Sequence, residues 1–318
     1  MFRFLLAKLV SKFVSSIQYS IGLSHITIMR KNYKKIRNIN DLEHKVFSQN
    51  GEDGIIDYLL HSLKISKPKF IEIGVGDYKE CNSRFFYERT SPRGLIIDNI
   101  KNFNEKVKKN VKLWKGDLTI VEKTINSKNI IKTLKDNNFY NDIDFISLDI
   151  DGTDYWVLEK LPKELSKIFV LEFNSAFGGD KEITVPNINN FNRTKYHYSN
   201  LYFGASLKAL IKLMKKKNYV FLGTNLHSIN AFFVQKKYLK KINLKIPSSR
   251  NINKFSISNI RESRNKKNKL NYLSGDEKIN EIRNCNVVDL SSSKKKTVKL
   301  GKLFYISKKY KNTWTMWL

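Results

Sequence analysis

Between residues 52 and 234, short apolar runs alternate with stretches whose apolar residues recur every three or four positions. The short runs are typical of buried strands, and the periodic stretches are typical of amphipathic helices. Alternation of this kind predicts an α/β domain whose sheet is largely parallel and covered by helices on both faces. The predicted strands are Lys69–Ile73, Gly94–Asp98, Val111–Trp114, Phe145–Ile150, Ile168–Phe173, Tyr219–Gly223 and Ala231–Val234.

The last two predicted strands must pair differently from the others. Only Thr224–Asn230 separates them, which is too short for a crossover helix, so we expect an antiparallel pair. The fold class is therefore a doubly wound, mostly parallel, seven-stranded Rossmann-like sheet with a terminal antiparallel strand pair. Asn218 is well suited to end the helix before that pair. The main predicted helices are Glu52–Lys64, Ser83–Arg89, Val121–Asp136, Tyr155–Leu161 and Ser206–Lys217.

The charge of the chain is concentrated at its two ends. The formal net charge is +30; residues 1–40 hold eight basic side chains and no acidic one, and residues 235–318 hold 22 basic and five acidic. Such an excess favours nucleic acid or an anionic membrane as a partner. It is also typical of chains rich in Lys, Asn and Ile from A/T-rich genomes. The predicted domains are a basic amphipathic N-terminal arm (1–40), an α/β domain (41–236) and a basic, partly mobile C-terminal extension (237–318).

The segment Met1–Arg30 follows the spacing of an amphipathic helix. Lys8 and Lys12 interrupt its apolar run, whereas a signal peptide would place its positive charge before an unbroken apolar segment. This helix could lie in a membrane interface, or it could pack on the domain or on a partner. We expect a cytoplasmic protein. A contact between residues 1–36 and an anionic membrane would place it peripherally at the inner membrane. No apolar run reaches the roughly 18 residues of a membrane span. Two cysteines exclude a disulfide framework.

A glycine turn follows the first predicted strand. In the sequence Phe70–Asp77, Glu72 lies near the end of a buried strand, and two glycines, Gly74 and Gly76, follow it. Glycines allow a sharp turn and a close approach of the backbone to a ligand. The third glycine of a dinucleotide-binding motif would fall at Lys79, so the motif does not predict NAD binding.

Acidic residues follow the next two predicted strands. Asp98 ends the second strand, where its carboxylate could accept hydrogen bonds from the ribose hydroxyls of a nucleoside. Asp117 follows the third, where it could meet an adenine amino group. Each of these acids could instead cap a helix or stabilise a turn.

Four polar residues end the fourth and fifth predicted strands. Asp149 and Asp151 share one side of a strand, as do Glu172 and Asn174. Their oxygens could hold a divalent cation such as Mg²⁺, or one carboxylate could act as a general base on a substrate hydroxyl. Asp151 could also cap the following helix. His197, in the long insertion after the fifth strand, is another candidate base.

This arrangement resembles the class I S-adenosylmethionine-dependent methyltransferases. Within that class the chain is similar to the FkbM-type group and its bacterial relatives over roughly residues 45–235. It departs from them at the fourth strand, where Asp151 and Asp154 replace the more typical glutamates. The matching pieces are Ser48–Gly54, Glu72–Asp77, Glu80–Asn82, Asp149–Tyr155, Leu171–Asn174 and Tyr202–Leu207.

The resemblance implies a cofactor, S-adenosylmethionine, and an acceptor. We expect O-methylation of a sugar or of a surface-polysaccharide or glycolipid precursor. Alternatives are a nucleic-acid methyltransferase, which the acidic crevice disfavours, and a non-catalytic scaffold. By resemblance, the cofactor site comprises Glu72, Gly74, Gly76, Asp98, Asp117 and Asp149. The expected catalytic residues are Asp151, Asn174 and His197, and the expected metal ligands are Asp149, Asp151, Glu172 and Asn174.

Overall fold

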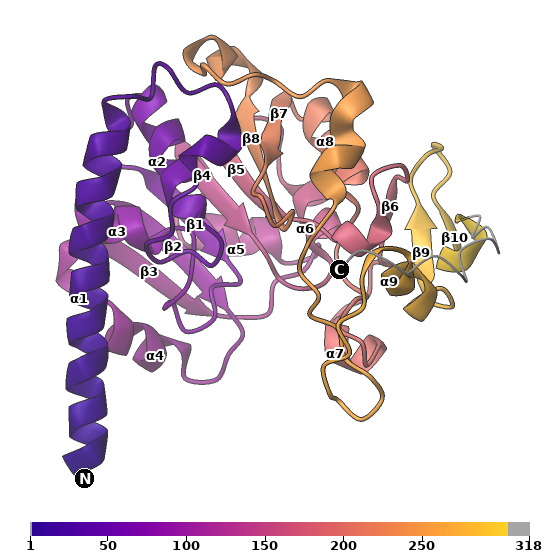
Figure 1. Cartoon of the computed structure of the whole chain (residues 1–318), viewed down its shortest axis with the longest axis horizontal. Helices are drawn as coiled ribbons and strands as arrows, with labels where there is room; N and C mark the ends of the chain where they lie inside the picture. The colour runs from indigo at the N-terminus through magenta and orange to yellow at the C-terminus, as the bar shows by residue number, and fades with distance from the viewer. Residues whose placement is uncertain (1, 305–318) are drawn as a thin grey trace, which may run out of the picture.

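A computed structural model describes residues 2–304, apart from the side chains of residues 2–9, 11–12 and 249–250. Its centre is a seven-stranded sheet with helices on both faces, and a smaller sheet lies at one end (Figure 1). The strand order of the large sheet is β3-β2-β1-β4-β5-β8-β7. Its strands are β1 (Lys69–Ile73), β2 (Arg93–Asp98), β3 (Asp117–Glu122), β4 (Ile143–Leu148), β5 (Ser166–Glu172), β7 (Tyr219–Thr224) and β8 (Asn230–Gln235).

The pairing of these strands confirms the predicted fold class. All pairs from β3 to β5 are parallel, whereas β8 is antiparallel to both β5 and β7. Side chains alternate between the two faces: Ile71 packs on one and Phe70 on the other. The first face is covered by α5 (Ile130–Asp136), α6 (Asp154–Lys160) and α8 (Leu207–Lys216), and the second by α2 (Glu52–Ser62), α3 (Arg84–Thr90) and α4 (Phe103–Asn110).

The predicted third strand is wrong. Val111 ends α4, because its N–H donates to the carbonyl of Val107, and a short 3₁₀ helix follows at Leu113–Lys115. The actual strand β3 begins at Asp117 and covers the start of the helix predicted at Val121–Asp136. The predicted stop of α8 is confirmed, since Asn218 takes a positive φ of 69°.

The insertion after β5 and the basic extension fold together. Strand β6 (Ile183–Thr184) pairs with β9 (Asn286–Asp289), which pairs with β10 (Lys296–Lys299). The helix α9 (Gly275–Glu281) packs beside them, and buried residues such as Phe177 and Ile282 form a separate apolar cluster there. Much of the extension is therefore ordered against the insertion; its end, residues 305–318, lies outside the described residues.

The helix α1 (Phe2–Arg30) runs along the outer edge of the molecule (Figure 1). Its C-terminal half packs on the domain: Ile26 is fully buried, and a Cβ on Gly22 would lie 2.5 Å from Cγ2 of Val46. Packing on the domain, one of the predicted options, is therefore confirmed for this half. Within residues 2–304, no helix has the length and apolarity needed to cross a bilayer.

A buried ion cluster fixes the end of α1. The Asp57 carboxylate on α2 accepts from Nε and Nη2 of Arg30, at 2.9 and 2.7 Å, and from the Tyr33 hydroxyl at 2.8 Å. Arg89 of α3 also lies 2.5 Å from it. Burial favours a raised pKa for Asp57, but the hydrogen bonds and charges of the arginines outweigh it and lower the pKa. Three helices therefore depend on one ionised carboxylate.

We predict that Asp57→Asn lowers the free energy of unfolding by about 3 kcal/mol, because it leaves two arginines facing each other without a counter-charge. Urea unfolding measures this loss. As a control, Glu105→Gln removes the exposed pair with Lys108 and should change stability by less than about 0.5 kcal/mol. Equal effects of the two substitutions would contradict the assigned role of Asp57.

Candidate functional site

A cavity of about 810 Å³ opens over the carboxyl ends of β1, β2, β3 and β4. The chain proceeds outward from β1 in one direction through β2 and β3, and in the other through β4 and β5. In open α/β sheets, ligands bind at this reversal of strand order. The cavity is lined mainly by residues 72–77, 79–82, 97–100, 123–126, 149–153 and 190–194.

The glycine turn lies at the floor of the cavity, as the sequence predicted. Gly74 has φ of +82°, and a Cβ on it would lie 1.4 Å from the carbonyl oxygen of Asp149. Gly76 has φ of +57°, and a Cβ on it would meet nothing within 4 Å. Gly74 is therefore required by the approach of the β4 backbone, whereas Gly76 leaves open space on the cavity side.

Glu72 holds the loop that leaves this turn. Its two carboxylate oxygens accept from the backbone N–H groups of Asn82 and Ser83, at 2.7 and 2.8 Å. Burial raises the pKa of Glu72 to about 7, although these hydrogen bonds oppose the shift. Glu72 thus shapes the cavity wall and also lines it.

Asp98 ends β2 and lines the cavity beside the glycine turn. Its Oδ2 accepts from the N–H of Gly76 at 2.8 Å, and its Oδ1 accepts from the N–H of Ile100 at 3.0 Å. Each carboxylate oxygen has a second lone pair for a ligand hydroxyl. The structure therefore brings Glu72, Gly74, Gly76 and Asp98 together as predicted.

Asp117 is not part of the site. It begins β3 instead of following it, so it lies at the opposite edge of the sheet, where it is exposed and pairs with Arg93. The prediction failed because the third strand was placed one element too early. The residues that follow β3, Lys123–Asn126, line the cavity instead. The β-branched run Thr119–Val121 was the sequence signal for the true strand.

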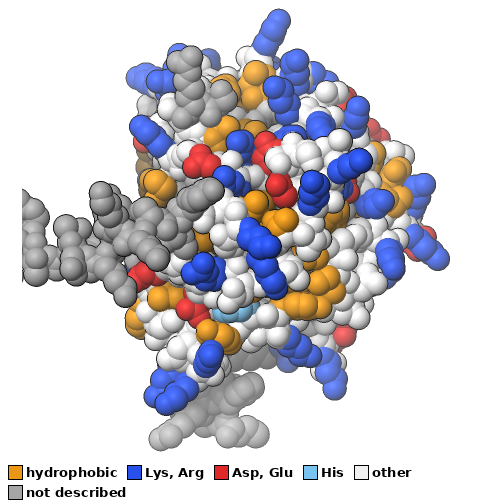
Figure 2. All heavy atoms as spheres, turned by 90° about the vertical axis from the view of Figure 1, so that its right-hand side faces the viewer, with side chains coloured by type: hydrophobic (Ala, Val, Ile, Leu, Met, Phe, Trp, Pro, Cys, Tyr) orange, Lys and Arg blue, Asp and Glu red, His pale blue; other side chains and the backbone are white. Residues whose placement is uncertain are grey.

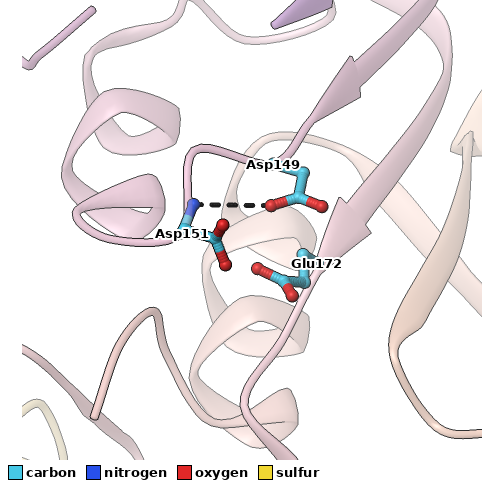
Figure 3. Close-up of side chains that lie close together, drawn as sticks. All are labelled: Asp149, Asp151 and Glu172. Carbon is cyan, nitrogen blue, oxygen red and sulfur yellow. Dashed lines mark hydrogen bonds between the residues drawn. The ribbon is translucent and has the colours of Figure 1, made fainter. Parts of the chain in front are cut away.

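Three carboxylates converge at the ends of β4 and β5. Asp149 and Asp151 follow β4, Glu172 ends β5, and their side chains point toward one another (Figure 3). One oxygen of each lies within 4.8 Å of the others, a spacing at which these three could hold the predicted divalent cation. Burial and the charge of Asp151 raise the pKa of Asp149, and burial and the two aspartates raise that of Glu172. Close carboxylates that cannot all ionise together retain a proton, which is typical of acid–base sites.

Arg193 supplies the opposite charge. It comes from α7 (Arg193–Tyr196) in the insertion, and its Nη1 donates to Oδ1 of Asp151. Its Nε and Nη2 donate to the carbonyl of Asn200, at 3.1 and 2.8 Å, which fixes the guanidinium. No sequence signal singled out this arginine among the many basic residues.

Asn174 does not join the carboxylates, contrary to its predicted catalytic and metal-binding roles. Its side-chain amide donates to the carbonyls of Leu201 and Phe203, at 2.8 and 2.9 Å, and its Oδ1 accepts from the N–H of Ala176. It is buried, does not line the cavity, and fastens the end of the insertion to β5.

His197 is also wrong as a candidate base. It lies outside the cavity lining, its Nδ1 is 2.7 Å from Oγ of Ser199, and its ring stacks on Tyr198 with centroids 4.4 Å apart. Burial lowers its pKa. Asp154 begins α6, and its carboxylate accepts from the N–H groups of Ile150 and Gly152, which closes the turn after β4.

Glu52 is a cavity residue that sequence reasoning missed. It begins α2 and is fully buried. Its Oε1 accepts from the side-chain amides of Asn225 and Asn230, both at 2.8 Å, and its Oε2 accepts from the N–H of Asn50. This carboxylate connects α2 to the β7–β8 hairpin at the edge of the cavity. Its place in the Ser48–Gly54 piece was the available signal.

No known protein-family profile matches the chain, and no curated protein sequence matches it significantly. Among solved structures, it is similar to an O-methyltransferase family protein from Burkholderia thailandensis, with 10% identity and a TM-score of 0.35 over 58% of this chain. The match spans 59% of that protein's length. An S-adenosylmethionine-dependent methyltransferase from Clostridium acetobutylicum matches with 9% identity and a TM-score of 0.36, over 57% of this chain and 89% of that one.

The two glycines of the turn give a matched pair of variants. We predict that Gly74→Ala prevents stable folding, because the new methyl group overlaps the backbone of Asp149. Gly76→Ala should cost only about 1–2 kcal/mol, the price of a left-handed conformation for alanine. Soluble yield and denaturant unfolding measure both effects. A stable Gly74→Ala protein would contradict the close approach of β1 and β4.

Proposed function

We propose that the chain is an S-adenosylmethionine-dependent methyltransferase that methylates a hydroxyl oxygen of a sugar or of a surface-polysaccharide or glycolipid precursor. The observation that carries this proposal is the cavity at the reversal of strand order, with Gly76 open toward it and Asp98 beside it. A nucleoside-sized ligand needs a backbone that it can approach closely and a carboxylate for its ribose hydroxyls. Both features are present on neighbouring strands.

The residues of the cavity fit this cofactor. The free space at Gly76 suits the amino-acid end of the cofactor, and Glu72 lies in the wall next to it. Asp98 has lone pairs for the ribose, and Lys123–Asn126 take the place that Asp117 was expected to hold near the base. When bound, S-adenosylmethionine would supply an activated methyl group. The chain would mainly align the acceptor with it.

The carboxylate cluster would activate the acceptor hydroxyl. Asp149 lines the cavity at the end of β4, and its raised pKa makes it a stronger base than an ordinary aspartate once it is ionised. Asp149 would take the proton of the acceptor hydroxyl. Glu172 and Asp149 would share the negative charge of their neighbouring carboxylates. Arg193 already balances Asp151, so we propose that this chemistry needs no divalent cation.

The rest of the wall supports a polyhydroxyl acceptor. Asn126, Asn190 and Asn192 offer amide donors and acceptors to the cavity. Phe191 lines the same wall and stacks on Tyr196, with ring centroids 4.7 Å apart. A flat apolar surface with polar groups around it suits the apolar face and the hydroxyls of a sugar ring.

Nucleic acid fits this site less well. The cavity wall carries Asp98, Asp149 and Asp151, which would repel phosphates. Figure 2 shows the small-sheet face of the molecule, where Lys and Arg side chains are scattered, with acidic and hydrophobic side chains between them. This pattern differs from the continuous basic stripe that typically follows a nucleic-acid backbone.

We predict that the purified protein binds S-adenosylmethionine in isothermal calorimetry and that Asp98→Asn weakens the binding about tenfold or more, because a charged acceptor of ribose hydroxyls is lost. Asp117→Asn is the matched control: the same change at the far edge of the sheet should leave binding unchanged. A folded protein that does not bind the cofactor would point to a scaffold without catalysis.

We predict that the methyl-transfer rate rises with pH, with its midpoint well above the ordinary pKa of an aspartate near 3.9, because burial and Asp151 raise the pKa of the Asp149 base. Asp149→Asn should abolish the reaction at every pH. Asp151→Asn removes the neighbouring negative charge, so the pKa of Asp149 should fall and the profile should shift to lower pH. Initial rates on a panel of sugar acceptors measure this.

A chelator provides the control for this mechanism. Treatment with EDTA should leave the rate unchanged, and a loss restored by Mg²⁺ would contradict the role given to Arg193. RNA in place of the sugar panel tests the acceptor class. Methyl transfer to RNA alone would overturn the sugar proposal and leave the cofactor site intact.

A further inference from the structure

The helix α1 carries two apolar faces, and the domain covers only one of them. The buried face includes Gly22, Ile26 and the half-buried Met29, which pack against Val46 and neighbouring residues. A second set of apolar side chains is exposed. This exposed stripe consists of Val10, Phe13, Val14, Ile17, Ile21 and Ile28, with exposed fractions between 42% and 67%.

The exposed stripe is continuous along the helix. At 100° per residue, its six side chains fall within an arc of about 100°. Twelve large apolar side chains are exposed in the described part of the chain, and half of them belong to this single helix. Single exposed apolar residues are ordinary, but a contiguous stripe marks a surface that is covered in use.

Positive charge gathers at the C-terminal end of the stripe. Lys31, Lys34 and Lys35 follow the helix and are exposed. The segment Lys236–Lys241, about 200 residues later in the chain, adds four exposed lysines beside them (Figure 1). Hydrogen bonds join the chain just after the two segments: the N–H of Lys245 donates to the carbonyl of Arg37, and Nη1 of Arg37 donates to the carbonyl of Asn243, at 2.7 and 2.9 Å.

This combination of charge and apolarity selects the partner. Two copies of the helix would bring like charges together, since residues 1–40 contain no acidic side chain. An anionic lipid surface is complementary to both features: the stripe would enter the region between headgroups and acyl chains, and the lysines would contact the headgroups. We propose that α1 binds the protein peripherally to an anionic membrane surface. This surface is separate from the cavity, so binding to it does not depend on methyl transfer.

Flotation of the full-length protein with vesicles tests the proposal. We expect binding to vesicles of phosphatidylcholine and phosphatidylglycerol (3:1), little binding to pure phosphatidylcholine, and a decrease as salt rises. The double variant Phe13→Ser/Ile21→Ser should bind these vesicles at least about tenfold more weakly than the unaltered protein. Its matched control, Leu226→Ser/Ile257→Ser, removes two equally exposed apolar side chains elsewhere and should bind as the unaltered protein does.

Two further outcomes would overturn the proposal. Equal flotation of both double variants would show that the stripe is not the contact. A failure of the unaltered protein to float, together with a dimer in light scattering that Phe13→Ser/Ile21→Ser dissociates, would assign the stripe to a second copy. Circular dichroism of each variant confirms that its helix content is retained.

Discussion

The close approach of the backbones of β1 and β4 determines where the site forms. The chain turns at Gly74, where the carbonyl of Asp149 occupies the volume of a side chain. This contact is possible only with glycine, and it brings the end of β1 next to the end of β4. The cavity, the open face of Gly76 and the position of Asp149 all follow from it. The neighbouring strand β2 then contributes Asp98, which fastens the turn through the N–H of Gly76.

Buried carboxylates serve two purposes in this protein, and their counter-charges distinguish them. Asp57 faces two arginines and a tyrosine, which stabilise its ionised form and join three helices. Asp149 and Glu172 lie against other carboxylates, with Arg193 paired to Asp151, so their raised pKa favours proton exchange. The first arrangement stabilises the fold. The second places carboxylates with raised pKa values at the edge of the cavity.

The sequence predicted elements well where a single physical cause produced the pattern. The buried strands β1, β2, β4 and β5 are mostly apolar because both of their faces are covered. The run Val111–Trp114, predicted as the third strand, instead holds the C-cap of α4 and the start of a 3₁₀ helix, and β3 follows it as a partly buried strand at the sheet edge. The error moved Asp117 to the wrong edge of the sheet. Where the end of a strand was predicted correctly, as for β2 and β4, the acids there, Asp98 and Asp149, line the cavity as expected.

What the sequence alone determined is therefore local: the alternation of strands and helices, the glycine turn, and the acids at strand ends, since these depend on neighbours along the chain. Tertiary structure alone decided which polar groups meet. Arg193 reaches Asp151 across 42 residues, and Asn174 turns away to hold the backbone at Leu201 and Phe203. It also decided which face of α1 is covered. A side chain's partner depends on packing between distant segments, and periodicity along the sequence carries no record of that packing.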